Sequence, residues 1–77
     1  MTITEIGRVV RNQRRAHKLR QAELAAIAGV GTRFVSELEN GKFSLEMGKA
    51  LQVLETVGLE LSVSPRSAQW ETNDAAK

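Results

Sequence analysis

The stretch "QAELAAIAGVGTRFVSELEN", residues 21 to 40, decides the fold because two short amphipathic segments flank a turn that contains glycine. The first segment ends at Gly29, a residue suited to the left-handed position after a helix, and the second runs from about residue 32 to residue 40. Their apolar residues are Leu24, Ile27, Ala28, Phe34, Val35 and Leu38. Two short helices joined in this way predict a helix-turn-helix unit.

Particular positions inside this unit have structural roles. A small residue is needed where the two helices cross steeply, and Ala25 meets that need. Gly29 permits the sharp turn, while Val35 and Leu38 anchor the second helix from beneath. The opposite face of the second helix is therefore expected to point outward from its N-terminal end.

The outward residues of the second helix are the predicted readers of DNA bases, because this helix enters the major groove in helix-turn-helix proteins. We predict base contacts by Thr32, Arg33, Ser36 and Glu37. The Arg33 guanidinium can bridge two acceptors of guanine, and Thr32 and Ser36 can pair with several bases or touch a thymine methyl group. Glu37 has two interpretations: it accepts a hydrogen bond from cytosine, or it is a solvated acid that discourages phosphate.

Basic and amide side chains near the helix ends indicate the DNA backbone as a further partner. We expect phosphate contacts from Arg11, Arg20, Gln21, Asn40 and Lys42. Residues 1–20 hold six Lys or Arg against one acid, whereas residues 43–77 hold three basic and five acidic residues, so one end of the molecule is basic. Solubility alone is the alternative for Arg20 and Lys42, and at most half of the basic residues between 8 and 18 are expected to approach DNA.

Two more helices are predicted, one on each side of the unit. The first begins at Thr2, in a capping box, or at Thr4, and fades near His17. The last has Ser44 as its N-cap and ends at Gly58. The expected inner positions are Ile3, Ile6, Val10 and Gln13 in the first helix and Leu45, Met47, Ala50, Leu51, Leu54 and Val57 in the last.

The segment "GLELSVSP", residues 58–65, alternates strictly between apolar and polar residues and predicts a strand. The chain has no second alternating run that could pair with it, so we expect it to pair antiparallel with its own copy across a twofold axis. Its dimerisation residues are Leu59, Leu61 and Val63. The predicted fold is mainly α: a helix-turn-helix domain over 1–58 with its unit at 21–40, a strand over 59–65 that forms an intermolecular two-stranded sheet in a homodimer, and a flexible tail over 66–77.

Length and composition limit the remaining functions. Seventy-seven residues without cysteine make one small domain, and no apolar run approaches the ~20 residues that a membrane span needs, so we expect a soluble cytoplasmic protein. The only histidine, His17, is expected to pack at the end of the first helix, and the only aspartate lies in the tail, so we predict no metal, no cofactor and no enzymatic activity. Trp70 either folds back on its own domain or anchors a protein partner.

Beyond these patterns, "QAELAAIAGVGTRFVSELENGK" resembles the Xre/Cro-type helix-turn-helix family, including its "ELENGK" after the recognition helix. The continuation "SLEMGKALQVLETVGLELSVSPR" resembles the HipB branch of antitoxins and autorepressors. The resemblance implies a dimeric repressor that binds a palindromic operator in its own promoter and docks a HipA-like kinase toxin. It also places Thr32, Arg33 and Ser36 at base-reading sites, Gln21 and Asn40 at phosphate contacts, and Arg14 with Glu39 in an internal ion pair.

The sequence departs from the family pattern at three positions. Lys18 stands where glycine is usual, Arg20 where a Ser or Thr N-cap is usual, and Gly31 where a polar cap is usual. Lys18 indicates either strain or a differently shaped turn. Two alternative functions stay open: a stand-alone repressor without a toxin, and a monomeric helix-turn-helix module that binds protein.

Overall fold

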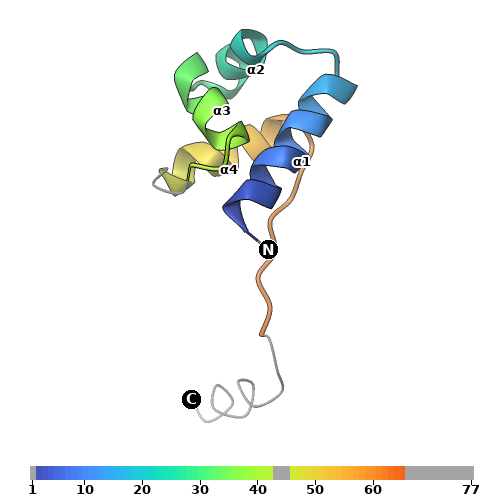
Figure 1. The fold of residues 1–77 in the computed structure, drawn as a ribbon, viewed down its shortest axis with the longest axis vertical. Coiled ribbons are helices and arrows are strands. Elements are labelled where there is room, and N and C mark those ends of the chain that lie inside the picture. The colour runs from blue at the N-terminus through green and yellow to red at the C-terminus, as the bar shows by residue number, and fades with distance from the viewer. Residues whose placement is uncertain (1, 43–45, 66–77) are drawn as a thin grey trace.

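Residues 2–42 and 46–65 are described in the structure, a computed structural model, and they contain four helices (Figure 1). These are α1 (Ile3–Ala16), α2 (Gln21–Ala28), α3 (Thr32–Glu39) and α4 (Met47–Thr56). The predicted four-helix architecture is therefore confirmed. Figure 1 shows α2 and α3 together at one end of the molecule, while the chain after α4 leaves from the other end.

The helix α1 begins where the capping box was predicted. The Glu5 amide donates to Thr2 Oγ1 at 3.2 Å, and the Thr2 amide donates to Glu5 Oε1 at 2.6 Å. The buried residues of this helix are Gly7, Val10 and Arg14, while Ile3 and Ile6 pack partly buried against the core. The predicted side of α1 does face the core. It also contains a glycine and an arginine, which the spacing of apolar residues does not reveal.

Gly7 allows α1 to lie directly on the C-terminal end of α3. A Cβ atom added at this position would collide with the Leu38 carbonyl oxygen and would stand 2.8 Å from the Glu39 carbonyl oxygen. Backbone oxygens cannot move aside as the end of a flexible side chain can. The contact between α1 and α3 therefore requires a residue without a side chain.

The helix-turn-helix unit packs largely as the sequence predicted, but Ile27, which was expected on the apolar face of α2, is 65% exposed. Ala25 is 2% exposed at the crossing, and Val35 and Leu38 are completely buried beneath α3. Gly29 has a φ of 77°, in the left-handed region that glycine enters without steric cost. The core of the domain lies between this unit and the helices α1 and α4.

Three of the helices end in the same way, with a residue in the left-handed conformation followed by two backward hydrogen bonds. After α1 this residue is Lys18, with a φ of 59°, and its amide and that of Leu19 donate to the carbonyl oxygens of Arg15 and Arg14. Gly41 and Gly58 occupy the equivalent positions after α3 and α4, with φ values of 79° and 80°. Of the two alternatives for Lys18, the structure supports strain over a differently shaped turn, since Lys18 adopts the conformation that a glycine would favour.

The helix α4 differs from its prediction at its start and on its exposed side. It begins at Met47 with Glu46 as N-cap, whereas Ser44 and Leu45 lie outside the described residues. Met47 is 63% exposed and Leu51 is 43% exposed, although both were expected in the core. The buried positions of the helix and its C-cap are Ala50, Val53, Leu54 and Val57. Val53 was missed, and the helix is rotated so that part of its apolar surface faces outward.

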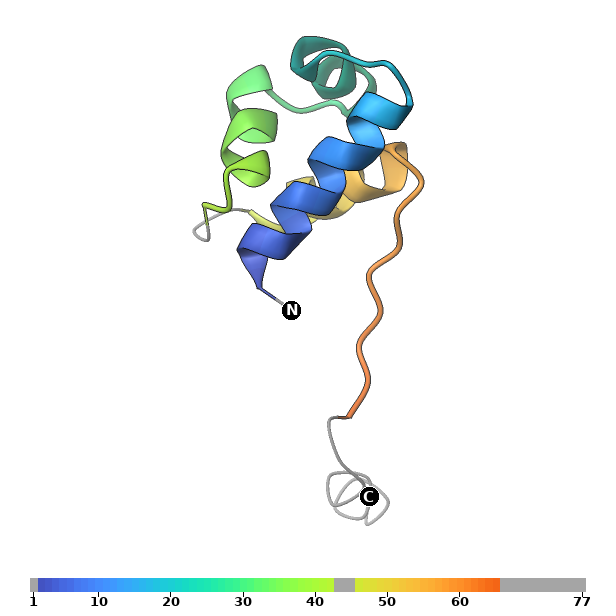
Figure 2. The ribbon, with the colours of Figure 1, turned by 45° about the vertical axis from the view of Figure 1, so that its right-hand side comes forward.

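Residues 59–65 form no strand within the described part of this single chain, which corrects the predicted secondary structure. A strand needs ladder hydrogen bonds, and those expected for this segment belong to a second copy. Figure 2 shows the segment running away from the helices. Leu59 still packs against the core, whereas Leu61 is 41% exposed and Val63 is 93% exposed.

An apolar groove lies where this segment leaves the domain. Its lining residues are Ile6, Val9, Leu54, Leu59, Glu60, Leu61 and Ser62. None of the helices in the described ranges has the length and apolar character of a membrane span.

Candidate nucleic-acid interface

The four predicted base-contacting residues lie together on the outer side of α3. We call this set the recognition face: Thr32, Arg33, Ser36 and Glu37. Val35 and Leu38 are buried on the inner side, so the helix cannot turn without losing its core contacts. The structure thus brings the predicted residues to one surface, and their contacts with bases stay a prediction.

Glu37 is held between two cations at this surface. Arg33 Nε donates to Glu37 Oε2 at 3.2 Å, and Lys42 Nζ donates to the same oxygen at 3.2 Å. The hydrogen bond from Lys42 is the main cause that lowers the pKa of Glu37; burial raises this pKa, but the charge of Lys42 and the hydrogen bond from Arg33 lower it further, so the net shift is downward. Glu37 is therefore ionised and paired in the free protein.

A second carboxylate, that of Glu39, connects the core to the candidate phosphate contacts. Its side chain is completely buried, and it accepts from Arg14 Nε at 2.6 Å and from Arg14 Nη2 at 3.0 Å. Gln21 Nε2 donates to it at 3.1 Å and Arg11 Nε at 3.4 Å. We call these four residues the Glu39 cluster. The internal pair of Arg14 and Glu39 that the family resemblance implies is confirmed.

The Glu39 cluster compensates the cost of burying charge. Burial raises the pKa of Glu39, but the hydrogen bonds from Arg14 and Gln21 and the charge of Arg14 outweigh it, so the net shift is downward. The hydrogen bonds that Arg14 donates to Glu39 correspondingly raise the pKa of Arg14. Arg14 Nη1 also donates to the Leu19 carbonyl oxygen at 2.8 Å, which ties the end of α1 to the same cluster.

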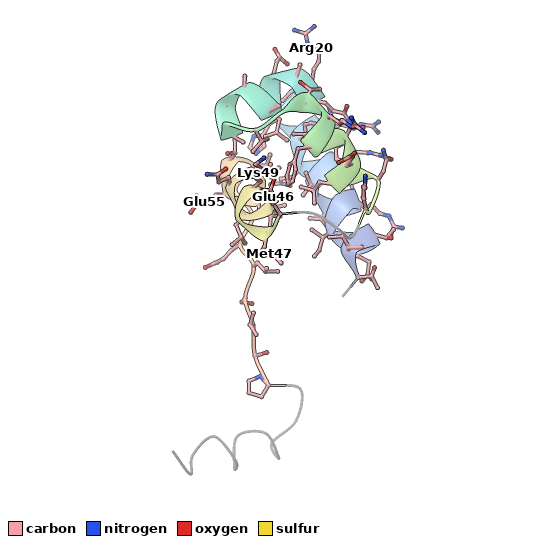
Figure 3. All side chains as sticks on the ribbon, turned by 90° about the vertical axis from the view of Figure 1, so that its left-hand side faces the viewer. Arg20, Glu46, Met47, Lys49 and Glu55 are labelled. Atoms are coloured by element: carbon pink, nitrogen blue, oxygen red, sulfur yellow. The ribbon has the colours of Figure 1, made fainter. Side chains whose placement is uncertain are left out.

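The predicted phosphate-contacting residues lie around this cluster at the ends of the helices. Gln21 is the first residue of α2, and its amide is oriented by Glu39. Arg11 Nη2 donates to Asn40 Oδ1 at 3.2 Å, which joins the middle of α1 to the end of α3. Arg20 and Lys42 are exposed, and Figure 3 shows Arg20 at the tip of the molecule, far from Met47 on α4. Their contacts with phosphate remain predictions.

The start of α2 has an acidic substitute for the usual cap. The Arg20 side chain makes no capping hydrogen bond, in agreement with the expectation that it is a poor N-cap. The Arg20 amide instead donates to Glu23 Oε1 at 2.7 Å, and this bond is the main cause that lowers the pKa of Glu23. Half of a capping box thus remains, and the Arg20 guanidinium stays largely exposed.

The other predicted residues lie away from this surface. Leu59, Leu61 and Val63 follow α4, and Trp70 lies outside the described residues. The His17 ring nitrogen Nε2 is 3.2 Å from the Val57 carbonyl oxygen, so His17 contacts the end of α4, in line with the packing role expected for it.

Sequence reasoning missed the link from Gln21 to Glu39. No sequence pattern identifies the partner of a glutamine at the start of a helix. Gln21 and Glu39 come together only when α1, α2 and α3 pack. The "ELEN" motif identified the carboxylate, and only the family resemblance indicated that it is internal.

Comparison with known proteins supports the helix-turn-helix fold. The helix-turn-helix family HTH_3 matches residues 10–63. A relative from Sinorhizobium fredii, the "Uncharacterized HTH-type transcriptional regulator y4mF", is 48% identical over 62 residues, which are 80% of this chain and 82% of the relative. Neither description is that of an enzyme.

Two solved structures have a similar fold. One is called "MDT Protein" and the other "Structure of HipA-HipB-O2-O3 complex". Each has a TM-score of 0.76 and 18% sequence identity, and the match covers 87% of this chain and 94% of the other chain. At this identity the likeness concerns the fold.

Proposed function

Because the chain belongs to the HTH_3 helix-turn-helix family, we propose that it is a dimeric transcriptional repressor that binds a palindromic operator in its own promoter. The observation that carries the proposal is the surface formed by the recognition face and the ends of α2 and α3. It presents Arg33 at the exposed N-terminal turn of α3, with Arg20 and Lys42 beside the ends of the two helices. Such an arrangement suits base contacts in the major groove flanked by phosphate contacts.

The dimer in this proposal uses residues 59–65. Leu61 and Val63 are exposed in the single chain, and Leu61 lines the apolar groove. Antiparallel pairing with a second copy would satisfy the backbone of the segment and cover both side chains. It would also fix the distance between the two copies of α3, which must match half-sites about one helical turn, ~34 Å, or a multiple apart.

We further propose that the repressor is the antitoxin of a HipA-like kinase. The support is the fold shared with a chain of the HipA–HipB complex, and the resemblance of residues 44–66 to the HipB branch. Co-purification with the product of the neighbouring gene tests this point. A repressor that controls its promoter while no neighbouring gene encodes a kinase would be the stand-alone alternative.

The experiment that tests DNA binding measures the affinity of the full chain for the duplex upstream of its gene at several salt concentrations. With about 6 to 10 phosphate contacts in the dimer, the slope of log K against log salt should lie between about −5 and −9. Lys42→Gln should make the slope shallower by about two for the dimer, one for each protomer. Lys49→Gln on α4, which pairs with Glu46, is the matched control and should leave the slope unchanged. No detectable binding at low salt would refute the proposal.

A further inference from the structure

Glu37 is the least exposed member of the group that it forms with Arg33 and Lys42. Its side chain is 27% exposed, compared with 89% for Arg33 and 51% for Lys42. Both cations donate to the same carboxylate oxygen, Oε2. An exposed arginine has many orientations, so a bond to a partly buried neighbour on the same helix restricts where its guanidinium can point.

The end of α3 explains why Lys42 is available to Glu37. Gly41 turns the chain back in the left-handed conformation, and the Lys42 amide then donates to the Glu37 carbonyl oxygen at 3.0 Å. The Lys42 ammonium group reaches the side chain of the same residue. The three side chains together carry one net positive charge, so the carboxylate can face DNA without a net repulsion of phosphate.

The geometry points to Glu37 as a positioning residue that orients Arg33 for end-on contact with one guanine in each half-site. This inference rests on the proposed DNA-binding function. The bond to Glu37 uses Arg33 Nε, so Nη1 and Nη2 are the two guanidinium nitrogens left for a base. These two nitrogens match the O6 and N7 acceptors of guanine. Glu37 in this role touches no base, unlike the direct contact with cytosine considered from the sequence.

The test is selection from a random-sequence duplex library with the full chain, followed by a comparison of enriched sites. The wild type should enrich a motif with one guanine position that Arg33→Ala abolishes. Glu37→Gln should lower the preference for guanine at that same base pair by about 3- to 10-fold, within the roughly 5- to 150-fold discrimination of a bidentate contact. The other positions of the motif should be unchanged.

The control variant is Glu46→Gln, which removes the same charge from an exposed pair with Lys49 at 2.8 Å on α4, where Figure 3 shows both residues. It should leave every base preference intact. Exposed ion pairs contribute little to folding stability, so the circular dichroism spectrum of Glu37→Gln should match that of the wild type.

Two results would overturn the inference. If Glu37→Gln changes the preference at a base pair other than the one that depends on Arg33, then Glu37 reads a base itself. If it raises affinity and leaves the guanine preference unchanged, then Glu37 only competes with DNA for the two cations. A wild-type protein that enriches no sequence would refute the proposed function, and that outcome is distinct from both.

Discussion

Removing the Glu39 carboxylate alone should cost a large part of the unfolding free energy of this domain. In Glu39→Leu the Arg14 guanidinium, whose side chain is 10% exposed, loses the acceptor of its bonds at 2.6 and 3.0 Å. A buried charge without its partner destabilises a protein by about 3 to 5 kcal/mol. A chain of 77 residues has a total unfolding free energy of only about 4 to 12 kcal/mol.

The double variant Arg14→Met with Glu39→Leu distinguishes two effects on the unfolding free energy. One is the cost of leaving a single buried charge without its partner, and the other is the effect of removing both charges. Both buried charges are replaced by apolar side chains of similar size, and such replacements are often neutral or stabilising. We expect its unfolding free energy to lie within about 2 kcal/mol of the wild type, far above either single variant. The interaction free energy between the two substitutions, obtained from the four unfolding free energies, measures how strongly Arg14 and Glu39 depend on each other.

Urea unfolding followed by circular dichroism, at one fixed protein concentration because a dimer is expected, measures all four proteins. Thermal midpoints should rank the four proteins in the same order as urea unfolding does. The midpoint of Glu39→Leu should lie about 12 to 40 °C below that of the wild type. The reasoning fails if Glu39→Leu costs less than about 1 kcal/mol, or if the double variant is as unstable as the single ones.

Four further predictions concern the turn, the close helix contact, the dimer and pH. Lys18→Gly should raise the unfolding free energy by about 0.5 to 1 kcal/mol, because relief of the left-handed backbone exceeds the added entropy of glycine; a lower thermal midpoint would contradict this. Gly7→Ala should cost about 1 to 3 kcal/mol in urea unfolding, whereas the control Gly48→Ala, with open space around it, should be neutral or stabilising. Leu61→Lys should sediment as a monomer with intact helicity and weakened operator binding, and an unchanged dimer would be evidence against the proposed pairing. Folding lowers the pKa values of four carboxyl groups, those of Glu5, Glu23, Glu37 and Glu39. The stability that these groups contribute is therefore complete above about pH 4.5 and should disappear as the pH falls further. An unfolding free energy from urea titrations that stays constant down to pH 3 would exclude this contribution.

The helix-turn-helix unit could be predicted because its determinants are local. Ala25, Gly29 and Val35 have the size or backbone freedom that a steep crossing demands, and their spacing along the chain is enough to identify it. Strain at Lys18 was one of two alternatives, and it came from the family resemblance, in which a glycine is usual at this position. Residue size at the crossing and backbone freedom at the turn depend only on one or two neighbouring helices.

The features that escaped prediction depend on packing between distant segments. Gly7 looks like a weak point in a helix until the end of α3 is placed against it. The apolar face of α4 is broader than the part that the domain covers, so periodicity alone assigned Met47 and Leu51 to the core. The helix α4 begins at Met47, two residues later than expected, with Glu46 as its N-cap, and the expected cap Ser44 lies outside the described residues. The segment 59–65 has the alternating pattern of a strand, but within the described part of this single chain it forms no ladder hydrogen bonds. The partner strand that we expect for it belongs to a second copy.

The uncovered side chains of Leu61 and Val63 have a consequence for gene dosage. If residues 59–65 are paired only in the dimer, the amount of DNA-binding species grows with the square of the protomer concentration while most of the protein is monomeric. Operator occupancy would then respond more steeply to expression level than a one-to-one binder allows. A promoter controlled in this way would switch over a narrower range of protein copies, and the sharpness would come from seven residues outside the DNA-binding unit.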